Sequence, residues 1–89
     1  MTAPAGTPVF NCVVHVAARD AEGTVHARVV NLAGIEARGR SEREALGQCV
    51  AAFKAAVGAA TAANQPIPWI EPVPQPAAGE IQRLIAVHL

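Results

Sequence analysis

Apolar and polar side chains alternate with a period of two along residues 9–19 and again along residues 24–30. This period is typical of β-strands, and the many valines strengthen the interpretation. The polar residues 20–23 between the two runs have the composition of a turn. We therefore predict an antiparallel hairpin in which Val29 lies opposite Val14, so that the apolar faces of the two strands coincide.

A third, shorter strand is predicted at residues 35–38, after a turn that contains Gly34. A helix is predicted over residues 42–63, because Ser41 is a favoured N-cap and Glu44 stands at the capping-box position. Apolar residues recur along this helix at spacings of three and four and form one stripe: Ala45, Leu46, Cys49, Val50, Phe53, Val57 and Ala60. We expect the stripe to cover one face of the sheet.

A second stripe on the same helix holds small residues: Gly47, Ala51, Ala55, Gly58 and Ala62. One interpretation is a solvated face of helix-forming alanine, in which each glycine costs about 1 kcal/mol relative to alanine. The other is a smooth face against which a second chain packs closely.

Five prolines at nearly alternate positions in residues 66–78 predict an extended arm that cannot join the middle of a sheet. Such a segment could be a ligand for an aromatic-groove domain. We favour an ordered crossover packed by Ile67 and Trp69, because the chain must return to the sheet after the arm.

Residues 80–88 are rich in β-branched and other apolar side chains, which favours a fourth strand. Both faces of this strand are apolar, which predicts a central or interface position. The competing interpretation is a helix, since helical spacing also relates Ile81, Leu84, Ile85 and His88.

The composition indicates one small domain of residues 9–89, preceded by a flexible leader at residues 1–8. Apolar residues make up 52% of the 89-residue chain but aromatic residues only 3%, so the core is expected to be thin. Because a chain of this length buries a modest fraction of its surface, we expect a homo-oligomer, a dimer or larger.

Seven basic and seven acidic residues give a net charge of zero, which argues against direct binding to DNA or RNA. We find no signal peptide and no run of about 18 apolar residues that would span a membrane. The two cysteines, Cys12 and Cys49, are expected to be buried, reduced thiols of a cytoplasmic protein.

Three histidines, His15, His26 and His88, are predicted to project from the sheet face opposite the helix. His15 and His26 would be diagonal neighbours, but nothing in the pattern places His88 beside them, so we expect no metal site. Glu36 and Arg38 could suggest acid–base chemistry, but no nucleophile or oxyanion-hole signal accompanies them. We therefore expect no enzyme activity, no catalytic or cofactor-binding residues and no cofactor.

The order of elements and several short motifs resemble the HicB-like antitoxin family over about residues 9–70. The motif residues are the turn Asp20/Gly23, the glycines before the third strand and the helix, Ser41-x-x-Glu44-Ala45, and Gln65-Pro66-Ile67-Pro68. The resemblance implies an α+β fold of order β-β-β-α-β, a truncated ribonuclease H-like domain. In it a three-stranded antiparallel sheet gains a fourth strand beside the first, and one helix packs on one face.

The family resemblance also implies a function, the neutralisation of a small basic RNA-cleaving toxin of the HicA type by direct binding. Family members carry a further C-terminal DNA-binding domain, and this chain ends at the fourth strand, so DNA binding is not expected. The chain also lacks the family's usual proline-containing segment, at residues 31–33. The alternative is an orphan structural or RNA-associated domain without a toxin partner.

Overall fold

The computed structural model describes residues 9–88 of the chain. The flexible leader expected at residues 1–8 lies outside the described residues, as does Leu89.

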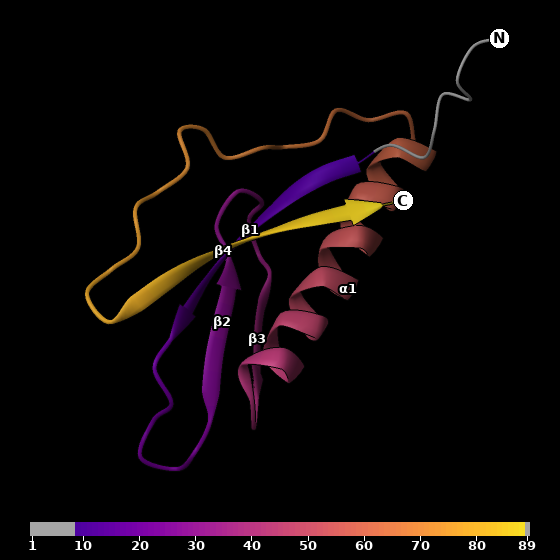
Figure 1. Cartoon of the computed structure of the whole chain (residues 1–89). Helices are drawn as coiled ribbons and strands as arrows, with labels where there is room; N and C mark the ends of the chain where they lie inside the picture. The colour runs from indigo at the N-terminus through magenta and orange to yellow at the C-terminus, as the bar shows by residue number, and fades with distance from the viewer. Residues whose placement is uncertain (1–8, 89) are drawn as a thin grey trace, which may run out of the picture.

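The described residues form four strands and one helix: β1 (Val9–Ala17), β2 (Val25–Val29), β3 (Glu36–Gly39), α1 (Glu42–Ala62) and β4 (Glu80–His88). All neighbouring strands are antiparallel, and their order in the sheet is β3-β2-β1-β4. Helix α1 lies across one face of this sheet (Figure 1). The predicted α+β fold, with the fourth strand beside the first, is confirmed.

The strand registers agree with the alternation in the sequence. Val14 lies opposite Val29 in the β1–β2 hairpin, as predicted. Strand β4 pairs with β1 over its whole length, from Val9 opposite His88 to Ala17 opposite Glu80. Of the two positions predicted for β4, the central one is wrong, because in the described sheet β4 has β1 on one side and forms the edge on the other. The interface position stays a prediction.

The core lies between the sheet and the apolar stripe of α1. Cys49, Phe53 and Val57 of the helix are fully buried and face Cys12 and Val14 of β1. The stripe of small residues is mostly exposed to solvent. The core is thin, as the composition indicated, because Phe53 is the largest side chain that the described residues bury completely.

Side chain and backbone contacts fix both ends of α1. The hydroxyl of Ser41 accepts a hydrogen bond from the backbone N–H of Glu44 at 3.1 Å, which is the N-cap predicted from the sequence. At the other end Asn64 adopts a left-handed conformation, with φ of 56°. The backbone N–H of Gln65 then donates to the carbonyl of Ala60 at 2.8 Å, which closes the helix with a Schellman motif.

Gly39 of β3 packs tightly against the side chain of Glu44 in the first turn of α1. A Cβ atom at this position would lie 2.9 Å from both Cβ and Cγ of Glu44. We expect Gly39→Ala to lower the free energy of unfolding by about 1–3 kcal/mol, because the strand and the helix must move apart. Denaturant unfolding measures the change.

Gly47→Ala is the matched control for Gly39→Ala. A Cβ at Gly47 meets no atom within 4 Å, and the residue lies inside α1. This variant should gain about 1 kcal/mol from the higher helix propensity of alanine. Equal effects of the two substitutions would contradict the close packing described at Gly39.

The proline-rich arm crosses from the end of α1 to the start of β4 (Figure 1). Ile67 and Trp69 pack against the core, as the crossover interpretation expected. The indole of Trp69 lies between two phenyl rings, with centroids 5.8 Å from Phe10 and 5.9 Å from Phe53. Trp69 also forms a β-bridge with Leu32, so the arm is joined to the segment that follows β2.

Candidate functional site

A cleft of about 270 Å³ lies between the first half of β1 and the proline-rich arm. We refer to it as the arm cleft, and its lining residues are Val9, Phe10, Asn11, Asn31, Trp69, Ile70, Glu71 and Val73. The cleft exists because β2 pairs with β1 only at the positions from Val14 to Val16. At Val13 and Asn11 the side chain of Asn31 takes the place of β2 beside β1.

Asn31 holds the closed end of the arm cleft. Its side-chain oxygen accepts from the backbone N–H of Val13 at 3.1 Å, and its amide donates to the carbonyl of Asn11 at 2.7 Å. The carbonyl of Asn31 also accepts from the N–H of Ile70 in the arm at 3.0 Å. One buried residue therefore continues the β-ladder of β1 with its side chain and anchors the arm with its backbone.

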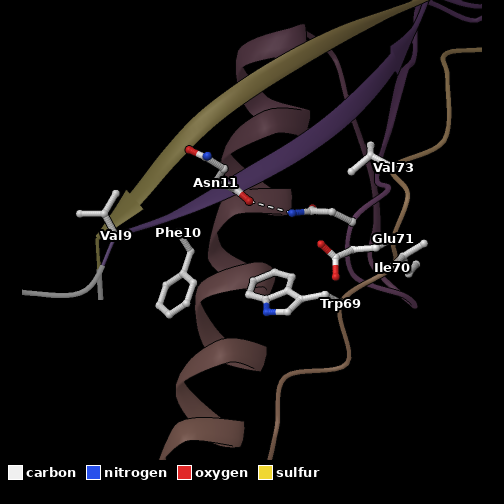
Figure 2. A pocket seen from close by; sticks show the side chains of 8 residues that line it. Val9, Phe10, Asn11, Trp69, Ile70, Glu71 and Val73 are labelled. Carbon is white, nitrogen blue, oxygen red and sulfur yellow. Dashed lines mark hydrogen bonds between the residues drawn. The ribbon is translucent and has the colours of Figure 1, made fainter.

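Aromatic rings and a carboxylate line the open part of the arm cleft. Phe10 and Trp69 supply the aromatic wall, and the carboxylate of Glu71 points toward the Trp69 side of the cleft (Figure 2). Glu71 is exposed, and it takes part in none of the ion pairs among residues 9–88. Aromatic faces and a carboxylate both attract cations.

The size of the arm cleft limits what it can hold. Pockets for small-molecule ligands usually measure about 300–1,000 Å³. A cleft of about 270 Å³ that opens to solvent suits a single inserted side chain better than a whole cofactor. Its chemistry fits the aliphatic stem and charged head of a lysine or arginine.

A second polar cluster covers the sheet face opposite α1 and is centred on His15. The guanidinium of Arg28 donates two hydrogen bonds, of 3.0 and 3.2 Å, to the carboxylate of Glu80. Since His15 lies between Arg28 of β2 and Gln82 of β4 in the register, this ion pair reaches across the strand that carries His15. His15 is fully buried as a result.

The ring of His15 is only half satisfied. Its Nε2 lies 3.0 Å from Oε1 of Gln82 and donates to it, because an amide oxygen only accepts. Its Nδ1 has no hydrogen-bond partner and lies 3.7 Å from Oε1 of Glu80. The same oxygen accepts from the backbone N–H of Ala77 at 2.8 Å. This cluster ties the arm and three strands together.

Glu80 makes the stability of the sheet depend on pH. Its hydrogen bonds from Arg28 and then from the N–H of Ala77 lower the pKa of its carboxyl below the ordinary 4.5. A lowered folded-state pKa adds stability above the unfolded pKa, and this stability is lost as the pH falls through the folded pKa.

Glu80→Gln should therefore flatten the acid side of the stability curve. We expect the free energy of unfolding of the variant to fall less steeply than that of the wild type below about pH 4.5. Urea denaturation at a series of pH values between 7 and 3 measures the slopes. Glu22→Gln removes an exposed carboxylate of the hairpin turn and should keep the wild-type slope, and parallel curves for Glu80→Gln would contradict the prediction.

The strand registers place His15, His26 and His88 on the sheet face opposite α1, as predicted, but the three side chains lie apart on that face. His15 and His26 are diagonal neighbours, as predicted, but His15 is buried where an exposed side chain was expected. His26 bonds Oδ2 of Asp20 at 3.0 Å, and His88 pairs with Val9 at the far end of the sheet. Residues 9–88 contain no group of three or more His, Cys, Asp or Glu side chains that could hold a metal ion.

Both cysteines are buried, free thiols between β1 and α1, as predicted. Burial, and secondarily the neighbouring Cys49, raises the pKa of Cys12 to about 12. Burial also raises the pKa of Cys49. Neither thiol forms the reactive thiolate at neutral pH, so both are structural.

Helix α1 has the length and apolar composition of a membrane-crossing helix, with a mean hydropathy of 1.3 in its most apolar 18-residue window. This differs from the sequence expectation that no stretch is apolar enough. The difference arises because alanine raises the hydropathy of the exposed face, where the helix makes no contact with the sheet. Length and composition are weak grounds for a membrane span in a helix whose other face packs on a sheet.

No pattern in the sequence singles out Asn31 or Glu71. Asn31 falls between the second and third predicted strands, and only its burial in the structure shows that its side chain bonds backbone groups. Glu71 is the one charged residue among the prolines of residues 66–78, and this isolation was the available signal.

Comparison with known proteins identifies no relative: no family model, no curated protein and no solved structure matches the chain.

Proposed function

We propose that this chain is an antitoxin-type protein-binding domain that neutralises a small basic RNA-cleaving toxin by direct binding. The resemblance to HicB-like antitoxins supports the proposal, and the strand order β3-β2-β1-β4 with α1 on one face is the fold that this resemblance implies. The observation that carries the proposal is the arm cleft, in which Glu71 stands beside the aromatic wall of Phe10 and Trp69.

The arm cleft is complementary to a basic partner. A lysine or arginine of the toxin would place its stem against the aromatic rings and its charge on the carboxylate of Glu71. The cleft is prepared before binding, because Asn31 and the Trp69–Leu32 bridge already hold the arm in place. A prepared site avoids the entropic cost of ordering a loop on binding.

The proposal includes a cytoplasmic location and a role without catalysis. Two buried free thiols in a short chain are compatible with a reducing compartment. The partner rather than this chain would cleave RNA, and the chain would act by covering the partner's active surface.

An affinity capture from the native host tests the proposal. The immobilised chain should retain a small basic protein, and this protein should cleave a fluorogenic RNA when purified. Adding the chain should stop the cleavage at a one-to-one ratio of binding sites. Failure to retain such a protein, or unchanged cleavage in the presence of the chain, would overturn the antitoxin function.

Glu71→Gln tests the role of the arm cleft in the same assay. Loss of a charged hydrogen bond of about 1.5–3 kcal/mol should weaken inhibition by about tenfold to a hundredfold. Glu22→Gln is the matched control, because it removes an exposed carboxylate outside the cleft. If both variants inhibit like the wild type, the toxin does not use the cleft.

A further inference from the structure

The edge strand β4 carries two exposed large apolar side chains. Leu84 is 68% exposed and Ile81 is 46% exposed, which makes them two of the three large apolar side chains that residues 9–88 leave in solvent. Long apolar edge strands are templates for pairing with another chain. Strand β4 is a nine-residue edge strand in which Leu84 and Ile81 are the exposed apolar positions.

The backbone of β4 has hydrogen-bonding groups that point away from the sheet. The N–H and carbonyl of Val13 bond to Asn31 and Val30, so the odd-numbered residues of β1 direct these groups toward β2. The even-numbered residues of β1 therefore bond to β4, and their opposites in the register are its odd-numbered residues. It follows that Gln82, Leu84 and Ala86 direct their N–H and carbonyl groups outward.

We propose that two copies of this chain pair antiparallel through β4, with Leu84 of each copy opposite Leu84 of the other. Leu84 is the middle residue of Glu80–His88, so this register pairs all nine residues of the strand with the nine of the second copy. The outward N–H and carbonyl groups of Gln82, Leu84 and Ala86 then form backbone hydrogen bonds with the outward groups of these three residues in the second copy. The two sheets form one continuous sheet with both helices on the same face.

The side chains are complementary in this register. On the face opposite α1, Leu84 packs against its own copy, and Ala86 of each copy lies opposite Gln82 of the other. On the helix face, exposed Ile81 gains Val87 of the second copy as its neighbour. Such self-complementarity is what a two-fold interface requires.

A neighbouring register, in which the two strands are centred on Arg83 instead of Leu84, loses this complementarity. Arg83 would then stand opposite Arg83 of the second copy, and like charges directly opposite each other are destabilising. Leu84 would face Gln82 rather than another apolar side chain. The register centred on Leu84 is therefore preferred.

Cysteine cross-linking tests the register in the full chain. Residues directly opposite each other in a hydrogen-bonded antiparallel pair have Cα atoms about 5.5 Å apart, within the range that a disulfide spans. Leu84→Cys should form a covalent dimer under mild oxidation. Ile81→Cys should stay monomeric on a denaturing gel, because in this register it faces Val87 of the second copy. Absence of the Leu84→Cys dimer, or equal cross-linking at both positions, would overturn the proposal.

Light scattering tests the dimer independently of any disulfide. The wild-type chain at tens of micromolar should show the mass of two chains, and Leu84→Asp should show the mass of one, because two carboxylates would face each other. Ala51→Asp adds the same charge on the exposed side of α1 and should keep the dimer. Circular dichroism of each variant reports retained folding, and a monomeric wild type or a dimer that survives Leu84→Asp would overturn the proposal.

Discussion

Replacing Phe53 with alanine is expected to lower the free energy of unfolding by about 3–5 kcal/mol, the largest effect of any single substitution considered for this chain. Phe53 is fully buried in the middle of α1, and its ring packs 5.9 Å from that of Trp69. The substitution removes the apolar area of the ring and leaves a cavity where the helix, β1 and the arm meet. A domain of this size typically has about 5–15 kcal/mol of stability, so much of it would be lost.

Urea denaturation followed by circular dichroism measures the effect of Phe53→Ala. Lys54→Ala is the matched control, because Lys54 is the next residue of α1 and is exposed. This control should change the free energy of unfolding by less than about 0.5 kcal/mol. A small loss in Phe53→Ala would show that the core does not centre on this ring.

Replacing Asn31 with alanine should have the second largest effect, a loss of about 2–4 kcal/mol. The substitution removes two hydrogen bonds and leaves the N–H of Val13 and the carbonyl of Asn11 without their partner. Each buried polar group that loses its partner costs about 1–3 kcal/mol. The arm should also loosen, because the backbone of Asn31 holds Ile70.

The measurement for Asn31→Ala combines urea denaturation with amide hydrogen exchange. Exchange at Val13 and Ile70 should accelerate more than exchange in the middle of α1, because the local contacts are lost first. Asn11→Ala is the control, since its exposed side chain can be removed while its carbonyl stays in place. Uniform acceleration in all elements would indicate a global rather than a local role for Asn31.

The strands and the helix were predictable because the signals that form them are local. Alternation along β1 and β2 set the hairpin register in which Val14 lies opposite Val29. Ser41 and Glu44 marked the start of α1, and the hydrogen bond between them confirms it. Each of these signals rests on residues that are close in the sequence.

The candidate site was much less predictable. Apolar residues on both faces of β4 predicted a central or interface strand, because the sequence pattern does not distinguish these positions, and β4 lies at the edge of the described sheet. His15 was expected in solvent, yet Arg28 and Glu80 from the neighbouring strands cover it. The arm cleft forms between β1 and the arm, two segments far apart in the sequence, so no local sequence pattern predicts it.

The sequence by itself determined the elements, the hairpin register and the buried stripe of α1, because periodicity, turn residues and helix caps act over a few positions. The tertiary structure decided the surroundings of individual side chains. Arg28 meets Glu80 across 52 positions, and His15 meets Gln82 across 67. Such contacts form only because the arm brings β4 back beside β1, and the path of the arm depends on the packing of the whole domain.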